Sequence, residues 1–298
     1  MASPRGRPPN DDHPITNHTY EIASMMRPSH FIVPNWFAAI LLIAGCSLLT
    51  SARADAAEPP QVRLAAANVP VAPGDAFQVT VEVFEVLGNE KLQLQDRHLV
   101  LFKGGKAYDF GLTEPRDVTL IDPVNSQVIL LSRVDHVKST ITHHEIVTAA
   151  ARFRLFATNE GLETRLGIDA KTTKDPNQDN RYSIEFGDYH YSVAAAEPSM
   201  AAQPHRFAEF TDWVARVNLV RKLGTPPFAR INLGNAIAAE GLIPQTVTLT
   251  LKSQTHSRTF VSSYTFKPGL SKESQQRLDE VAGMLTLYRD VPLAAFPR

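Results

Sequence analysis

Residues 98–132 read HLVLFKGGKAYDFGLTEPRDVTLIDPVNSQVILLS and contain two hairpin signals in succession. Gly104-Gly105 separates two apolar runs, and adjacent glycines supply the positive φ angles that a tight hairpin turn requires. The segment DPVN at 122–125 separates the next two runs, and proline at the second position of a turn presets its φ angle. The stretch therefore predicts two successive antiparallel hairpins.

The same period of two appears on both sides of this stretch. Apolar residues alternate with polar ones at 77–83, at 182–193 around Gly187-Asp188, and at 247–251, followed by a return strand at 260–266. Such alternation is typical of strands with one buried and one wet face. The polar faces are rich in threonine, which favours antiparallel pairing, because parallel strands are apolar on both faces.

Helical periodicity separates these strands. Thr142 and Glu145 form a capping-box pattern before apolar residues spaced as on a helix. Further amphipathic helices are expected at about 204–223 and 229–239, and a last one after the capping residue Ser271. The sequence thus predicts the α+β class, with a curved antiparallel sheet built from hairpins and amphipathic helices packed on one face.

Strand parity makes this prediction specific. We expect five residues to share one face of the sheet, under the helix that carries Phe210 and Val214, because each strand has one set of residues suited to a dry face. They are Val79, Val81, Leu249, Leu251 and Phe260.

The N-terminal region has the pattern of a targeting signal. Residues 31–50 carry no charge, and Ala52-Arg53-Ala54 follows as an A-x-A cleavage pattern, so residues 31–54 predict a signal peptide cut after Ala54. Two alternatives remain open. Ile43 to Cys46 matches a bacterial lipobox, which would lipidate Cys46, and the uncharged run is long enough to stay as a membrane anchor.

The predicted organisation follows from these segments. Residues 1–30 are a polar extension or a mis-called start, residues 55–75 an Ala- and Pro-rich linker, and residues 76–290 a single α+β domain. The protein is expected to be exported, periplasmic or secreted. In the alternative interpretation it is held at a membrane by lipidated Cys46 or by uncleaved residues 31–50.

Composition excludes several classes. The chain has 30 basic and 31 acidic residues and a net charge of −1, without a basic stripe, so we expect no nucleic-acid partner. Cys46 is the only cysteine, which leaves a processed chain without disulfides or thiolate ligands. No G-x-S-x-G elbow, P-loop or dinucleotide fingerprint occurs. The sequence therefore indicates no catalytic residue and no cofactor, and favours a non-catalytic protein.

One segment resembles a metal site. Asp175, Asn177 and Asp179 are spaced like the first three ligands of a calcium loop, but Phe186 stands where a bidentate glutamate is needed. We interpret the segment as a solvated turn. His143-His144 lies at the expected helix start, where adjacent side chains point about 100° apart and do not suit one ion.

The run HLVLFKGGKAYDFGL…DVTLIDPVNSQVILLSR, followed by a helix, resembles the LolA/LolB-type lipoprotein carriers of the cell envelope. The resemblance covers roughly residues 76–195 and is one of pattern. It implies an open, curved half-barrel whose helices cover an apolar cavity, with an apolar ligand or a lipoprotein acyl chain as partner. Two other functions remain open: an envelope hydrolase, and a membrane-anchored interaction or structural module.

Overall fold

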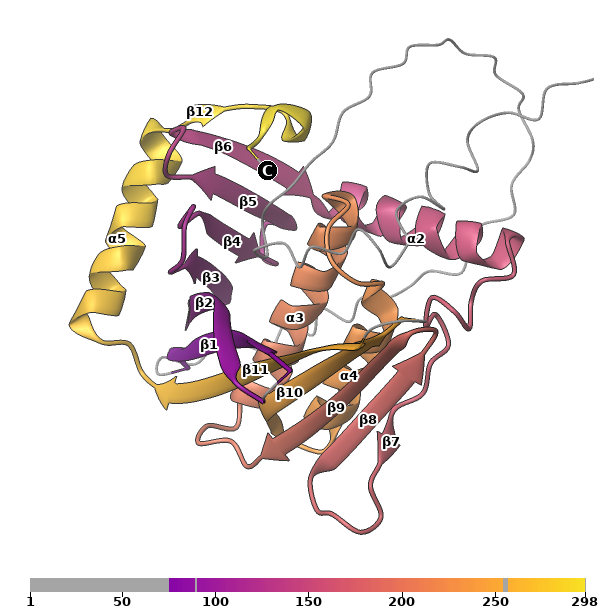
Figure 1. The fold of residues 1–298 in the computed structure, drawn as a ribbon. Coiled ribbons are helices and arrows are strands. Elements are labelled where there is room, and N and C mark those ends of the chain that lie inside the picture. Colours follow the sequence, from indigo (N-terminus) through magenta and orange to yellow (C-terminus); the bar gives the residue numbers. More distant parts are fainter. Residues whose placement is uncertain (1–74, 89, 254–256, 298) are drawn as a thin grey trace, which may run out of the picture. The chain divides into compact units, whose positions relative to one another are not determined.

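A single twelve-stranded sheet organises the chain (Figure 1). The computed structural model describes residues 75–88, 90–253 and 257–297. The strand order is β12-β6-β5-β4-β3-β2-β1-β11-β10-β9-β8-β7, and neighbours are antiparallel except for β12 with β6. The strands are β1 (Phe77–Val86), β2 (Leu92–Lys103), β3 (Lys106–Gly111), β4 (Val118–Asp122), β5 (Gln127–Ser132), β6 (Val137–Thr142), β7 (Thr173–Lys174), β8 (Arg181–Phe186), β9 (Tyr189–Ala196), β10 (Ile243–Lys252), β11 (Ser257–Pro268) and β12 (Arg289–Asp290).

The predicted hairpins are confirmed. Gly104 and Gly105 have φ angles of 59° and 76° in the turn between β2 and β3, and Gly187 has a φ of 51° between β8 and β9. The DPVN turn joins β4 to β5, where both oxygens of Asp122 accept hydrogen bonds from Asn125. Strand β6 was not predicted from the sequence. It pairs with β5 along its whole length and leads directly into a helix.

The helices begin where the capping patterns predict. Thr142 and Glu145 form the reciprocal capping box of α2, and the Ser271 side chain accepts a hydrogen bond from the Ser274 N–H at the start of α5. After α5 the chain adds β12 and a short 3₁₀ helix, and Phe296 is buried in the main core, beyond residue 290. The helices are α2 (His143–Asn159), α3 (Gln203–Val220), α4 (Pro227–Ala239), α5 (Lys272–Leu287) and η2 (Leu293–Ala295).

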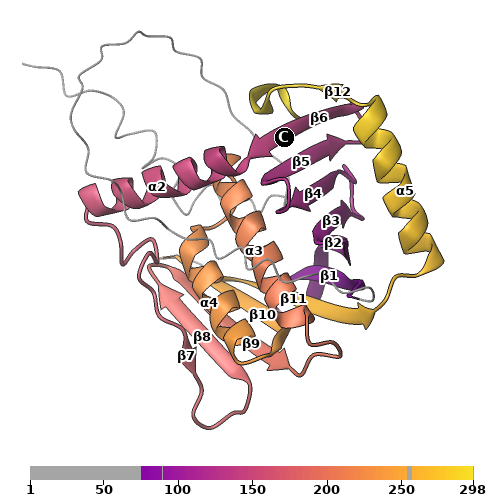
Figure 2. The same ribbon diagram turned by 180° about the vertical axis from the view of Figure 1, so that it is seen from behind.

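The sheet bends around α3, and we call the face toward α3 the concave face (Figure 1). Seen from behind, α3 and α4 lie in front of β8 to β11 (Figure 2). The register places Val79 and Val81 on this face with Phe260, because Glu85 pairs with Phe260 and lies on the same side. Phe260 pairs in turn with Leu249, whose neighbour on that face is Leu251. The predicted parity is confirmed.

The cover of this face is shared between two helices. Val79 and Val81 pack with Phe210 of α3, as expected, whereas Leu249 packs with the α4 residues Leu233 and Ile237. Helix α4 covers this part of the face because it follows α3 closely in the chain and packs against it.

The prediction that all helices pack on one face was wrong. Helix α5 lies on the opposite, convex face, where its residues Leu278 and Val281 contact Leu101, Phe110 and Leu131 (Figure 1). The physical reason is that strands β2 to β5 are apolar on both faces. All five residues of β4 are buried, and such strands need a second cover. None of the helices that the structure describes is long and apolar enough to cross a membrane.

Candidate functional site

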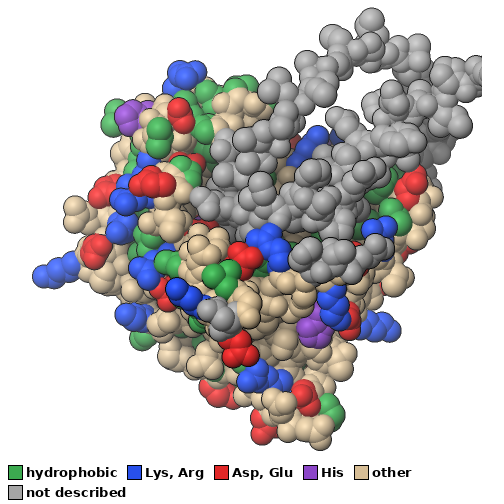
Figure 3. Space-filling model, in the orientation of Figure 1, with side chains coloured by type: hydrophobic (Ala, Val, Ile, Leu, Met, Phe, Trp, Pro, Cys, Tyr) green, Lys and Arg blue, Asp and Glu red, His purple; other side chains and the backbone are tan. Residues whose placement is uncertain are grey.

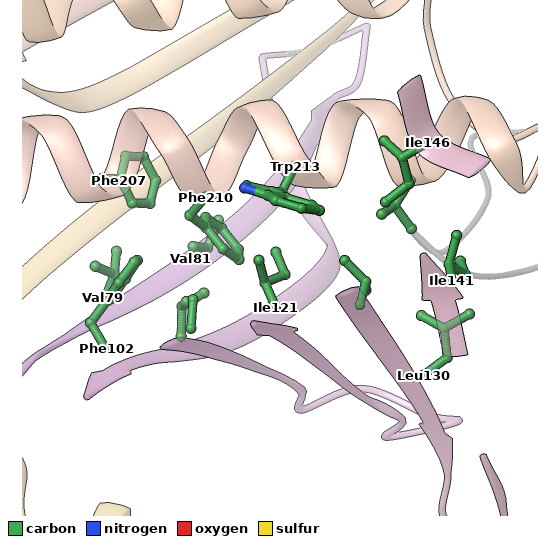
Figure 4. Packing of buried hydrophobic residues seen from close by; sticks show 14 of the residues in the cluster. Val79, Val81, Phe102, Ile121, Leu130, Ile141, Ile146, Phe207, Phe210 and Trp213 are labelled. Carbon is green, nitrogen blue, oxygen red and sulfur yellow. The ribbon is translucent and has the colours of Figure 1, made fainter. Parts of the chain in front are cut away.

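The candidate site is the concave face of the sheet beneath α3. The α3 side chains of Phe207, Phe210 and Trp213 pack against aliphatic and aromatic side chains of the sheet, which we call the floor (Figure 4). The Phe102 ring of the floor packs against two of these α3 side chains, with its centroid 6.4 Å from that of Phe207 and 5.7 Å from that of Phe210. Floor residues come from β1 to β6: Val79, Val81, Val100, Phe102, Ala107, Ile121, Val128, Leu130, Val137 and Ile141.

Polar contacts hold α3 near its two ends. At the N-terminal end, the Arg206 guanidinium donates to the backbone oxygens of Asp75 and Lys106, at 3.3 and 3.2 Å. Beyond the C-terminal end, the Thr225 hydroxyl lies 2.9 Å from the Tyr191 hydroxyl of β9. From Phe207 to Val217, the described residues show no hydrogen bond between an α3 side chain and the sheet. The middle of α3 is therefore held by apolar packing.

A small pocket lies between α3, α4 and β10, and its lining includes Phe207, Ala208, Ile237 and Leu242. Its free volume is about that of one water molecule. An acyl chain could enter this pocket only by displacing side chains of its lining, such as Phe207.

A buried charged triad interrupts the apolar floor. The register places Asp96 and His98 of β2 and Asp109 of β3 on the concave face, and all three are buried. His98 Nδ1 lies 2.8 Å from Asp109 Oδ1, and Nε2 lies 3.0 Å from Asp96 Oδ2. The other oxygen of Asp96 accepts hydrogen bonds from the Thr113 hydroxyl and the Arg97 N–H.

The two carboxylates hold His98 in its charged form. Burial opposes protonation of His98, but the negative charges and hydrogen bonds of Asp109 and Asp96 raise its pKa to about 10. Burial also opposes ionisation of Asp96, and the hydrogen bond and charge of His98 lower the pKa of that carboxyl nevertheless. The triad is thus an imidazolium between two carboxylates at neutral pH.

This geometry is poor for acid–base catalysis. A general base needs a free lone pair near the operating pH, and both ring nitrogens of His98 already face carboxylate oxygens. Thr113 supplies the hydroxyl beside the triad, and it donates to Asp96, not to the imidazole. The arrangement fits a buried ion-pair network that fixes β2 against β3.

Another buried carboxylate, that of Asp117, lies just before the first residue of β4. Asp117 accepts a hydrogen bond of 3.3 Å from the Arg133 N–H. Burial raises its pKa to about 6, against the opposing effects of that hydrogen bond and of the positive charge of Arg221 after α3. Asp117 therefore titrates close to neutral pH, at the end of the sheet nearest the C-terminus of α3.

The sequence-predicted site residues lie elsewhere. Asp175, Asn177 and Asp179 stand in the turn between β7 and β8, where Asp175 Oδ1 accepts from the Asn177 N–H at 2.8 Å and Asn180 has a φ of 57°. Among the residues that the structure describes, no group of histidine, cysteine and acidic side chains could hold a metal ion. Cys46 and Ala54 lie outside the described residues.

Sequence reasoning missed the triad, although a signal for it exists. Counting back from Phe102 by twos gives Val100, His98 and Asp96, so two ionisable residues fall on the parity of the core. Charged residues on a buried face are expected to be paired. The partner Asp109 follows from the two-residue Gly104-Gly105 turn, which pairs Val100 with Asp109 and so places Asp109 diagonally beside His98 on the same face.

Comparisons with known proteins include a distant likeness to a solved structure. No family model and no curated protein matches the sequence. Among solved structures, a LolA superfamily protein from Nitrosomonas europaea aligns with 68% of this chain and 90% of its own, at 9% identity and a TM-score of 0.27. This is a weak resemblance at the level of the fold.

Proposed function

We propose that this chain is an exported, non-catalytic protein of the cell envelope that binds an apolar ligand, such as a lipid or lipoprotein acyl chain, on its concave face. The observation that carries the proposal is the way α3 is held. Its ends have polar contacts, whereas its middle rests on the sheet through apolar side chains, among them Phe207, Phe210 and Trp213. An acyl chain that displaced these side chains would break no described hydrogen bond to the sheet.

The chemistry of the floor suits such a ligand. Aliphatic chains are held by apolar area, and each buried methylene contributes about 0.8 kcal/mol. The floor offers aliphatic side chains from six strands in succession. The hydrolase alternative draws no support from the triad, because its imidazole is occupied on both sides.

Trp213 provides a built-in reporter for the test. The chain has two tryptophans, so a Trp36→Phe chain carries Trp213 alone, on the face where the ligand is expected. Stearic acid with a nitroxide on its chain should quench Trp213 fluorescence in a saturable way, at one ligand per chain. Unlabelled fatty acid should restore the emission by competition.

A matched reporter on the other face controls for non-specific partition. Tyr288→Trp, in a chain with both native tryptophans changed to Phe, places the indole beside α5 on the convex side. We expect little quenching there. Equal quenching at both positions, or none at Trp213, would contradict the proposal and favour the interaction or structural module with a filled core.

The predicted export and processing of the N-terminal segment are tested separately. Fractionation of cells and N-terminal sequencing of the native protein should give a start at Asp55, following cleavage after Ala54, in the exported fraction. A modified Cys46 would instead show a lipid anchor, and an intact 31–50 segment a membrane-anchored form. In each of these three cases we expect the protein to contact a membrane only through its N-terminal segment.

A further inference from the structure

The outer half of the β1–β2 hairpin has one strand neighbour fewer than its inner half. Strand β2 pairs with β1 from Leu92 to Phe102, but its pairing with β3 begins at His98. Among the described strands, none pairs with residues 92–95 on the side away from β1. The backbone of this stretch therefore forms a strand edge, which is a template for a further strand.

Apolar side chains cluster on the convex face of the same stretch. Phe84 pairs with Leu94 across the hairpin and with Val261 of β11, and Val86 pairs with Leu92. Leu92 and Leu94 are 52% and 43% exposed, unlike the leucines of the inner half. We call these five residues the hairpin patch. An exposed apolar patch beside an open edge marks a site of association.

The charges around the patch are paired with each other. On the same convex face Glu82 lies 2.5 Å from Arg97, and behind it, on the concave face, Glu85 lies 2.9 Å from Arg258. Basic and acidic side chains are likewise interspersed over the face seen in Figure 3. No field of one sign therefore attracts a charged partner from a distance. A lipid surface would cover the leucines but could not hydrogen-bond the open edge. The surface suits a partner that brings a strand.

The geometry points to a second copy of this chain as that partner: we propose that two β2 edges pair antiparallel about a two-fold axis at Gln93. The sequence around Gln93 reads the same in both directions, Leu92-Gln93-Leu94. In this register Leu92 of one copy stands opposite Leu94 of the other, on the same face, and the two hairpin patches become continuous. The sheet also has edges at its two ends, where the terminal strands β12 and β7 are two residues long.

The size of the surface sets the expected strength. An interface formed by four edge residues and five patch side chains is expected to bury less than the roughly 800 Å² per partner of a standard stable interface. The dimer is therefore expected to form reversibly with rising concentration. Sedimentation velocity on the protein, purified in its native processed form, should show a monomer–dimer equilibrium.

Leu94→Lys tests the surface without touching the core, since Leu94 is exposed. It should raise the dimer dissociation constant by at least about tenfold, because a charge would stand where the two patches meet. Val124→Lys is the matched control: Val124 is 74% exposed in the turn between β4 and β5, away from the edge. It should leave the dissociation constant unchanged. Melting curves check that both variants fold.

Gln93→Cys, combined with Cys46→Ser where that residue is retained, tests the register. Opposite residues of antiparallel strands have Cα atoms about 4.5–5.5 Å apart, which a disulfide can bridge. Oxidation should link two copies of the Gln93→Cys variant through the introduced thiols, whereas Gln245→Cys, at an exposed position of β10, should stay unlinked. A monomer at all concentrations, a dimer insensitive to Leu94→Lys, or equal linking of the two cysteine variants would overturn the proposal.

Discussion

Strands β2 to β5 and strands β8 to β11 are two parts of one sheet, yet they are covered differently. The first part is buried between α3 on the concave face and α5 on the convex face. The second part has α4 on the concave face, while its convex face carries Thr246, Thr248 and Thr250 in a row. These threonines are partly exposed.

The difference shows that the second face of a strand decides the number of layers. Strand β4 reads VTLID with every residue buried, and β10 reads as alternating valine or leucine and threonine. Burial of apolar area contributes about 25 cal/mol per Å², so an apolar second face recruits a helix. A face of threonines can hydrogen-bond water, so it needs no covering helix.

The largest expected effect comes from a charge on the convex face of the first part. Leu101→Asp should cost more than about 5 kcal/mol of unfolding free energy, since it buries an unpaired carboxylate under α5. Thr265→Asp, on the exposed convex face of β11, should cost under about 1 kcal/mol. Urea unfolding of both variants measures the contrast. Equally mild effects would mean that α5 does not cover this face.

Removing the triad's cation should have the next largest effect. His98→Leu leaves Asp96 and Asp109 as uncompensated buried charges and should cost about 3–5 kcal/mol at pH 7. His190→Gln, on the convex side of β9, should change the unfolding free energy by less than about 0.5 kcal/mol.

The pH profile supplies the control for this interpretation. The folded-state pKa of His98, about 10, lies above the ordinary value of 6.5. Its stabilising effect should therefore be complete below pH 6.5 and disappear as the pH rises through 10. The difference in stability between the native chain and His98→Leu should shrink over that range. A constant difference would show that His98 is neutral in the folded protein.

Asp117→Asn should act in the opposite direction. The pKa of Asp117 is raised from 3.8 to about 6, so its ionisation lowers stability as the pH rises between these values. The amide avoids that cost and should stabilise the protein by about 1–3 kcal/mol at about pH 8, with little effect at about pH 4. Thermal melts at the two pH values test this. A destabilised variant at the higher pH would show that the ionised carboxylate is favourably paired.

The smallest effect is expected in the turn of the second part. Asp175→Ala should change the unfolding free energy by less than about 0.5 kcal/mol, because this turn is largely solvated. Calorimetric titration should show no calcium binding tighter than roughly 10 μM, since the loop lacks the bidentate glutamate. Tighter binding that Asp175→Ala abolishes would restore the metal interpretation.

Local signals predicted most of the elements and little of their assembly. The Gly104-Gly105 turn and the Thr142–Glu145 capping box act within a few residues, so both could be predicted from the sequence. The side on which α5 packs was predictable in principle from the apolar second face of β4. The threonine-rich face of β10 indicates one wet face, and this pattern does not extend to β4, whose residues are all buried.

The candidate site was less predictable. The pairing of Val100 with Asp109 follows from the two-residue turn, but the hydrogen bond from Thr113 to Asp96 depends on the path of the loop after β3. The position of α3 over the sheet depends on packing between Phe102 and Phe210, which are distant in sequence. Contacts of this kind are set by the whole core, not by a local pattern.

The pairing of β1 with β11 has a consequence for the order of folding. Phe77 pairs with Pro268, about 190 residues later, so the middle of the sheet joins the two ends of the described chain. The hairpins from β2 to β6 can form early, because their contacts are local. The sheet closes when β11 has been synthesised, and until then β1 has one neighbour. A chain that we propose to be exported would thus remain open, and threadable through a translocation pore, until its last strands emerge.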